Sequence, residues 1–444
     1  MSASLSSVTR CFKIAAGFAA TLVMSGLGAC SQQSLNVTTG ALPKGTGHNG
    51  NNVDILFMID NSSSMTAMQD KLVAQLSMLT QAMQALPTGV PDVHIAVVSS
   101  DMGAPGDAAG SDGCTTVGNG GVFFNQPENT CTSTMLQLGA TYVSDVGGVA
   151  NYTGDLADVL SCLMPLGDRG CGFEQPLASV ARALGADGQP APSQNAGFLR
   201  DDAELAIILL TNEDDCSAPV NTKLFSLGDG GSGSQSLENP LGLGPLANYR
   251  CNEFGHLCVD PTSTKPQTLI EPPLNPPTDA QGPATSPSLA LASCVSNDTV
   301  TGLLTPVSTF VRQIKSLKVD PDNQIVVGAI VAPPAPYTVS WQPSSGGSPG
   351  ATGELWPQIE HSCGVAGDAN TNPAATQTTA DGSFGDPGVR ITQWVQAFGS
   401  NGLTASICDG SYAAAFQAIA QKIGAHLEGP STGLDASAGL DAGG

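Results

Sequence analysis

The sequence has few basic residues, few aromatic residues and no long apolar run beyond its N-terminal region. Its 444 residues contain 15 Lys and Arg against 38 Asp and Glu, which gives a formal net charge of -23. Because phosphates are neutralised by clustered Lys and Arg, and here these residues are scattered singly, nucleic-acid binding is not expected. Aromatic residues make up 5% and hydrophobic residues 41% of the chain. We therefore expect a sizeable core together with long irregular stretches.

Several signatures of metal-dependent and phosphate-dependent catalysis are also absent. The sequence has no Cys-x-x-Cys pair, which would indicate a zinc or redox site, and no His-Glu-x-x-His motif, which would indicate a metalloprotease. It also has no Gly-x-x-x-x-Gly-Lys loop, which would indicate phosphate binding. Of the five histidines only His94 lies in a predicted core strand, where a structural role is expected. We therefore expect a binding protein and not an enzyme.

The N-terminal region predicts export and lipid anchoring. Two basic residues precede an apolar stretch at residues 14–27, which has the length of a signal peptide and not of a membrane span. The stretch ends in Leu27-Gly28-Ala29-Cys30, which resembles the lipobox of bacterial lipoproteins. The resemblance implies a signal peptide at residues 1–29, lipidation of Cys30 and, because Ser31 follows, a place in the outer membrane of the cell envelope, with the lipid as the only membrane contact. The alternative is an ordinary secreted protein with a free Cys30.

Cysteine content supports export. Of the twelve cysteines, Cys11 would be removed with the signal peptide and Cys30 would carry the lipid, which leaves an even number. An even number in an exported chain predicts disulfide bonds. The ten candidates are Cys114, Cys131, Cys162, Cys171, Cys216, Cys251, Cys258, Cys294, Cys363 and Cys408.

Apolar strands alternate with amphipathic helices between residues 52 and 427. Continuous apolar runs predict buried strands at residues 53–59, 93–98, 205–210 and 325–331, and a weaker strand near 403–407. Apolar residues at spacings of three and four predict helices at 62–86, 156–163, 177–184, 306–317 and 412–423. This alternation predicts an α/β fold with a doubly wound, mostly parallel sheet covered by helices on both faces.

Polar and Gly- or Pro-rich stretches flank and interrupt this pattern. Residues 30–51 are predicted to form a flexible tether, and residues 428–444 a disordered tail. Between them, residues 52–427 are expected to form one domain with insertions at about 101–154, 217–297 and 333–387. Five of the candidate cysteines lie in or beside the last two stretches, so we expect surface insertions stapled by disulfide bonds and not separate domains.

The clearest candidate for chemistry is the segment that follows the first predicted strand. It contains Asp60, Ser62 and Ser64 directly before a predicted helix, where open α/β sheets bind ligands. This Asp-x-Ser-x-Ser pattern resembles the metal-ion-dependent adhesion site of von Willebrand factor type A domains. The resemblance implies a Rossmann-like fold, a divalent cation (Mg²⁺ or Ca²⁺) held by these side chains, and a partner carboxylate as a further ligand. The alternative is that Asp60 and Ser62 only cap the helix.

The loop after the strand at residues 205–210 is the second predicted part of this site. Asn212 stands where the family usually has an Asp, so its amide oxygen or the carboxylate of Asp214 is expected to bind the ion. The remaining possible ligands are Glu213 and Asp215 in the same loop, Glu174 where the family has a Thr, and Asp101 after the second strand. A solvated acidic turn is the alternative for this loop. Cys171 is expected to pair with Cys162 or Cys216.

Together these features predict a lipid-anchored envelope protein. It would bind a protein or glycan partner that presents a carboxylate to a divalent cation. One alternative is a structural envelope component in which the cation only stabilises the fold, and another is a metal-dependent hydrolase.

Overall fold

A computed structural model of the protein describes residues 50–428, apart from residues 107, 110–112, 126–135, 228–240, 262–267, 279, 283–285 and 344–354. All of these residues belong to one unit, which begins at Gly45. The predicted signal peptide, the predicted lipidation site Cys30, almost all of the predicted tether and tail, and Cys131 lie outside the described residues.

The predicted apolar strands form the centre of a seven-stranded sheet. Its strand order is β14-β9-β5-β1-β2-β3-β4. The first five are parallel, and β3 and β4 continue the sheet as antiparallel strands. The strands are β1 (Asn52–Ile59), β2 (Asp92–Ser99), β3 (Val143–Val146), β4 (Val149–Ala150), β5 (Glu204–Leu210), β9 (Ile325–Val331) and β14 (Gly402–Ser406). The doubly wound, mostly parallel α/β fold is therefore confirmed.

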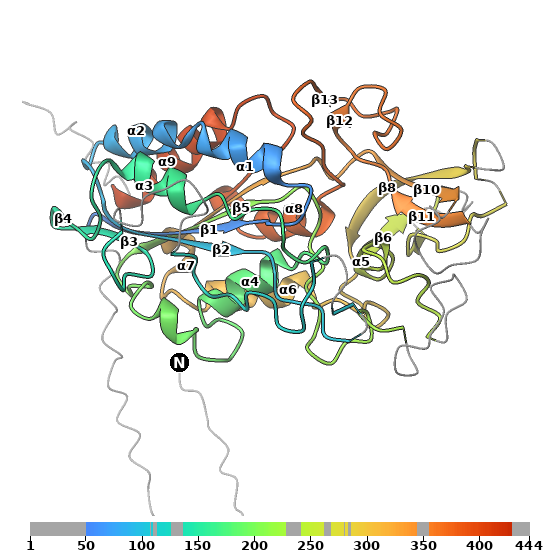
Figure 1. Ribbon diagram of the computed structural model, residues 1–444, viewed down its shortest axis with the longest axis horizontal. Coiled ribbons are helices and arrows are strands. Elements are labelled where there is room, and N and C mark those ends of the chain that lie inside the picture. Colours follow the sequence, from blue (N-terminus) through green and yellow to red (C-terminus); the bar gives the residue numbers. More distant parts are fainter. Residues whose placement is uncertain are drawn as a thin grey trace, which may run out of the picture. The chain divides into compact units, whose positions relative to one another are not determined.

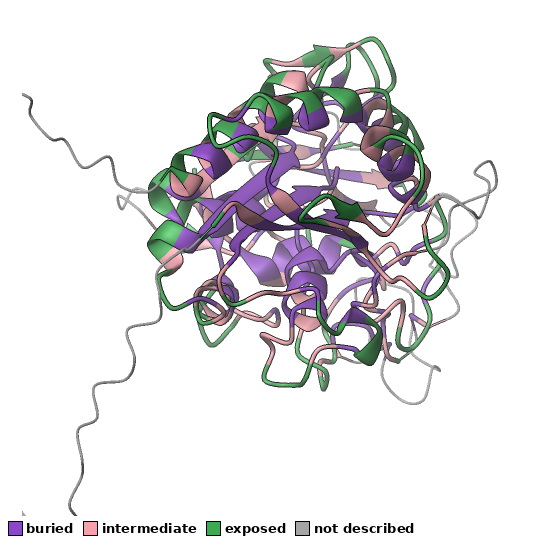
Figure 2. Ribbon diagram, turned by 90° about the vertical axis from the view of Figure 1, so that its left-hand side faces the viewer, coloured by how far each residue is buried: buried purple, intermediate pink, exposed green. Residues whose placement is uncertain are grey.

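Helices cover both faces of this sheet (Figure 1). Alternate residues of β1 explain why, since Phe57 packs in one core cluster and Leu56 in the other. One face carries α1 (Thr66–Val73), α2 (Leu76–Gln84), α3 (Leu156–Leu163) and α9 (Ala413–Leu427). The other carries α4 (Pro176–Ala183), α6 (Val307–Lys315) and α8 (Val389–Gln396), and the short α7 (Pro321–Gln324) precedes β9. Figure 2 shows the buried strands between two layers of helices, of which the upper layer carries exposed residues on its outer surface.

The helix predicted at residues 62–86 is two helices, and it begins later than expected. Gln75 separates α1 from α2 with a non-helical backbone (φ -122°, ψ 4°). Its carboxamide oxygen accepts hydrogen bonds from the backbone of Tyr412 (2.5 Å) and from the hydroxyl of Ser411 (2.9 Å). The helix is therefore interrupted at the residue that makes this tertiary contact, although the apolar period of the sequence continues through it. Helix α8 was not predicted, because the sequence before it is dense in Gly and Pro.

The two long insertions pair with each other, which the sequence did not predict. They form a five-stranded antiparallel sheet with the order β11-β10-β8-β6-β7, to the right of the first sheet in Figure 1. The first insertion supplies α5 (Tyr249–Gly255), β6 (His256–Val259), β7 (Leu269–Ile270) and β8 (Ser288–Ser296), and the second supplies β10 (Tyr337–Pro343) and β11 (Leu355–Ile359). Val339 and Trp341 are fully buried between them. The insertions thus form a second core and not loose surface loops.

Short elements complete the described part of the chain. Strands β12 (Gly364–Val365) and β13 (Thr378–Thr379) pair in parallel. Two 3₁₀ helices, η1 (Ser193–Asn195) and η3 (Gly399–Asn401), precede β5 and β14. Within the described residues, no helix has the length and apolar character needed to cross a membrane.

Disulfide bonds join segments far apart in the sequence. The pairs are Cys114–Cys171, Cys216–Cys251, Cys258–Cys294 and Cys363–Cys408, and Cys162 is also disulfide-bonded. The expected pairing of Cys171 with Cys162 or Cys216 is wrong, because the loop before α4 lies against Cys114. The predicted stapling of the insertions by disulfide bonds is confirmed for the first by two pairs and for the second by Cys363–Cys408.

Candidate functional site

The site lies at the carboxyl ends of the three central strands. Ile59 of β1 is paired with Ser99 of β2 and with Leu210 of β5. The residues that follow these partners therefore meet at one edge of the sheet, where α/β folds bind ligands. The backbone N–H of Asp60 still donates to the carbonyl of Leu210 (2.9 Å), which fixes the start of the loop.

The carboxylate of Asp60 is fully buried and joins all three strand ends. Its Oδ1 accepts the backbone N–H of Ser62 (2.8 Å) and the hydroxyl of Ser100 (3.1 Å), and its Oδ2 accepts the hydroxyl of Thr211 (2.7 Å). Burial raises the pKa of Asp60 above its usual value, although these hydrogen bonds act in the opposite direction. Ser100 was missed in the sequence, although it lies two residues after the strand predicted at 93–98 and directly follows β2.

Two serine hydroxyls and one amide oxygen converge next to Asp60. The hydroxyls of Ser62 and Ser64 are 3.3 Å apart, and Ser64 donates to Oδ1 of Asn212 (3.1 Å). Helix α1 begins only at Thr66 and has no side-chain capping hydrogen bond. The structure therefore does not show the capping role that was the alternative for Asp60 and Ser62. The neutral oxygens of Ser62, Ser64 and Asn212 lie within hydrogen-bond distance of one another in sequence, Ser62 to Ser64 and Ser64 to Asn212.

Two further carboxyl groups lie beside Asp60. Glu174 is 1% exposed and hydrogen-bonds to Glu213. Burial, and then the charges of Glu213 and Asp60, raise the pKa of Glu174 well above its usual range. Burial, and then the charge of Asp386, raise the pKa of Glu213 to about 8. The Oε1 atom of Glu174 is buried and has no hydrogen-bond partner.

These carboxyl groups line a small cavity of about 10 Å³, together with the Cys216–Cys251 disulfide bond. A cavity of this size holds a single water-sized particle. The wall opposite the sheet comes from the first insertion, where Asn248 donates to Oε2 of Glu213 (3.0 Å). Asp386 also lines the cavity, and its Oδ1 lies 2.6 Å from Nδ1 of His361. Asn248, Asp386 and His361 lie in the insertions, so no local sequence signal pointed to them.

Asp214 binds protein groups with both carboxylate oxygens. Its Oδ2 lies 2.8 Å from Nε2 of His256 and accepts the backbone N–H of Arg390 (2.8 Å), while Oδ1 accepts that of Ile391 (3.1 Å). Burial alone would raise the pKa of Asp214, but the hydrogen bonds from His256 and the backbone lower it. In this arrangement Asp214 caps helix α8 and anchors strand β6.

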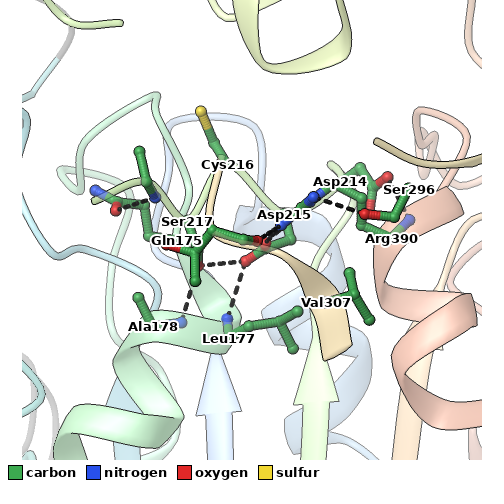
Figure 3. A network of polar contacts seen from close by, with 12 residues as sticks. Gln175, Leu177, Ala178, Asp214, Asp215, Cys216, Ser217, Ser296, Val307 and Arg390 are labelled. Atoms are coloured by element: carbon green, nitrogen blue, oxygen red, sulfur yellow. Dashed lines mark hydrogen bonds and ion pairs between the residues drawn. The ribbon is translucent and has the colours of Figure 1, made fainter. Parts of the chain in front are cut away.

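Asp215 forms a buried ion pair, which Figure 3 shows beside the start of α4. The guanidinium of Arg390 donates to Oδ2 from Nη2 (3.0 Å) and Nε (3.2 Å), and Oδ1 accepts the backbone N–H of Leu177 (3.0 Å) and the hydroxyl of Ser217 (2.5 Å). Burial raises the pKa of Asp215, against the effect of Arg390. Asp215 thus fixes two helices at the site.

Asp101 shapes its own loop. Its Oδ1 accepts the backbone N–H of Gly103 (2.9 Å), and its carbonyl accepts those of Asn119 (2.8 Å) and Gly120 (3.3 Å). Burial raises the pKa of Asp101.

The donor set of the site consists of hydroxyl, amide and carboxylate oxygens. No group of three or more His, Cys, Asp or Glu side chains in the described ranges is placed to hold a metal ion. An ion at this edge would therefore need Ser62, Ser64 or Asn212 as ligands beside one or two carboxylates. Such a mixed oxygen set suits Mg²⁺ or Ca²⁺ and does not suit zinc.

Comparison with known proteins finds similarities to solved structures at low TM-scores. No protein-family model and no curated protein matches the chain. Among solved structures, it is similar to the vWF domain of the type V pili tip protein Mfa5 from Porphyromonas gingivalis (TM-score 0.31, 13% identity, 85% of this chain and 97% of that chain). It is also similar to the pilus adhesin RrgA from Streptococcus pneumoniae (TM-score 0.28, 11% identity, 85% of this chain and 44% of that chain). A von Willebrand factor domain, the family that the sequence resembles, is therefore among the structures similar to this chain.

Proposed function

We propose that this protein is an adhesion-type binding protein of the cell surface, which holds a partner through a divalent cation. The ligands would be the oxygens of Ser62, Ser64 and Asn212 with the carboxylates of Asp60 and Glu174. The observation that carries the proposal is the Oε1 atom of Glu174, which is buried beside two other carboxyl groups and has no hydrogen-bond partner.

A bound cation would remove the unfavourable electrostatics of this edge of the sheet. A buried carboxylate needs hydrogen bonds or an opposite charge, and like charges oppose the ionisation of neighbours. Arg390 is committed to Asp215 and His256 to Asp214. A divalent ion would supply the missing positive charge, and it would attract a carboxylate from a partner because few charged ligands bind it.

Export and surface location form part of the same proposal. Disulfide bonds persist in oxidising compartments, and the four described pairs fit an exported chain. The lipid anchor at Cys30 and the outer membrane are proposed from the lipobox-like sequence alone.

Calorimetric titration of the metal-stripped protein tests the cation. We expect binding of Mg²⁺, Mn²⁺ or Ca²⁺, and at least a ~10-fold loss of affinity in Glu174→Gln, in line with typical effects of altering a metal site. The matched control is Glu428→Gln, which makes the same chemical change on the exposed end of α9. If the unaltered protein binds none of the three ions, the proposal is wrong.

A cation that only stabilises the fold is the second candidate. The hydrogen bond from Asn248 to Glu213 favours it, because it places the first insertion over this side of the site. Water-proton relaxation of the Mn²⁺-loaded protein separates the two roles. An open coordination position would hold an exchanging water, and added acetate would lower the relaxation rate by displacing it. A relaxation rate that acetate does not change would favour the structural role.

A further inference from the structure

We propose that Gln69 is the positioning residue of the cation site. Its carboxamide docks the loop of residues 166–174, which carries Glu174, onto the segment of Asp60 and Asn61. This inference rests on the proposed function, because the position of Glu174 matters for binding only if an ion is bound there.

Gln69 uses its whole carboxamide to join two parts of the site. It is 3% exposed, and its Nε2 donates to the carbonyl of Asp60 (2.8 Å) and to that of Gly167 (2.9 Å). Its Oε1 accepts the backbone N–H of Leu166 (2.9 Å). One side chain therefore connects the end of β1 with the loop that follows α3, and these three hydrogen bonds go to backbone atoms and not to the side chains of the proposed metal ligands.

A close backbone contact continues this junction. The backbone N–H of Gly170 donates to the carbonyl of Asn61 (2.6 Å). A Cβ atom at Gly170 would lie 2.2 Å from Oδ1 of Asn61, so the loop can approach this closely only with glycine there. That Oδ1 atom is itself buried without a hydrogen-bond partner. The loop of residues 166–174 and the segment of Asp60 and Asn61 are thus packed directly against each other.

The setting of Gln69 in helix α1 supports a role beyond packing. Its neighbours on the buried face of the helix are apolar, namely Met68 and Leu72. An apolar residue at position 69 would fit the period of this face, whereas a buried amide is tolerated only when its donors and acceptor are satisfied. Gln69 meets that condition only while both loops keep their positions.

The structure also explains how this docking reaches Glu174. Three residues lie between Gly170 and Glu174, and one of them, Cys171, is fixed to Cys114 by a disulfide bond. The backbone N–H of Cys216 donates to the carbonyl of Glu174 (2.7 Å). The disulfide bond and this hydrogen bond hold the end of the loop at Glu174. The hydrogen bonds of Gln69 hold the start of the loop, at Leu166 and Gly167, against Asp60.

The test is the variant Gln69→Met, which keeps the length of the side chain and removes its three hydrogen bonds. The matched control is Asn195→Leu. Asn195 is a buried carboxamide with the same pattern, since Nδ2 donates to Gly121 (2.8 Å) and Ala183 (3.0 Å) and Oδ1 accepts from Phe123 (3.0 Å). None of these three partners is a proposed ligand or belongs to the loop of residues 166–174.

We expect both variants to lower the melting temperature and only Gln69→Met to weaken cation binding, by ~10-fold or more, as seen when groups that orient metal ligands are removed. In the metal-free protein, amide hydrogen exchange at Leu166 and Gly170 should accelerate in Gln69→Met and stay unchanged in Asn195→Leu.

Two results would overturn the inference. If the unaltered protein binds the ion and Gln69→Met binds it equally well, Gln69 does not position the site, and the proposed function stands. If exchange at Leu166 and Gly170 does not change in Gln69→Met, the docking itself is wrong. Absence of ion binding by the unaltered protein would instead refute the proposed function, and the exchange data would still decide whether Gln69 docks the loop.

Discussion

Replacement of Glu253 by Gln should make the protein more stable at neutral pH. Glu253 lies in helix α5 of the first insertion, is 9% exposed, and its Oε2 is buried without a hydrogen-bond partner. Burial, and then the charge of Glu271, raise its pKa from 4.5 to about 8. The adjacent Arg250 opposes this shift, but its guanidinium is committed to carbonyl oxygens, among them those of Pro245 and Leu224.

The size of the effect follows from proton linkage. The folded protein keeps the proton of Glu253 up to about pH 8, whereas the unfolded chain releases it above pH 4.5. Stability therefore falls as the pH rises through this window and levels off above it. With these two pKa values the wild type loses ~2.5 kcal/mol between pH 5 and pH 7 relative to a variant with Gln at this position.

Urea unfolding at pH 5, 6, 7 and 8, followed by tryptophan fluorescence, measures this difference, because Trp394 lies in the core of the central sheet and Trp341 in that of the second sheet. Glu428→Gln is the control, because Glu428 is exposed at the end of α9. The stability of Glu253→Gln relative to the wild type should grow with pH, and that of the control should not. A difference that stays constant from pH 5 to pH 8 would refute the reasoning.

Three further changes test other parts of the structure. Replacement of Cys216 and Cys251 by Ser together opens a link between residues 35 apart and should lower the free energy of unfolding in urea by ~4 kcal/mol; unchanged stability would contradict this. Arg390→Met strands the buried carboxylate of Asp215 and should cost ~3–5 kcal/mol in thermal denaturation; a much smaller loss would count against the ion pair. Gly170→Ala places a Cβ atom 2.2 Å from a side-chain oxygen and should weaken cation binding in calorimetry by ~10-fold; unchanged affinity would argue against the tight junction.

The central sheet could be predicted because its signals are local. Runs such as residues 205–210 are apolar throughout, and all seven residues of β5 are buried. The helices that cover the sheet show a period of three to four residues. The predicted boundaries of α3 and β9 agree with the structure. The break at Gln75 could not be predicted, since it depends on hydrogen bonds to residues 336 and 337 positions away.

The second sheet could not be predicted because its pairing is not local. Strand β8 joins β10 across the whole of α6, α7 and β9. Its exposure pattern mixes buried and exposed residues without a strict alternation, and β7 has only two residues. Such short strands have no sequence pattern that distinguishes them from the Pro- and Gly-rich segments around them.

The candidate site was only partly predictable for the same reason. Asp60, Ser62, Ser64 and Asn212 lie together because they follow neighbouring parallel strands. The sequence indicated them through the Asp-x-Ser-x-Ser pattern and the family that it resembles. Asp214 and Asp215 follow the same strand, but their partners are far away in the sequence, His256 in the first insertion and Arg390 in α8, and a local pattern cannot identify them.

These partners give the insertions a defined place in the proposed function. His256 opens β6 and lies between the carboxylate of Asp214 (2.8 Å) and the hydroxyl of Tyr337 in β10 (2.8 Å). The same carboxylate caps α8. Asp214 therefore contacts both a helix of the central sheet and strand β6 of the first insertion, and His256 links it to β10 of the second insertion. Asn248 adds a bond to Glu213 in this loop. A partner that displaced the second sheet would therefore have to disturb the loop that carries Asn212. For this reason the sheet formed by the insertions is part of the site and does not move independently of it.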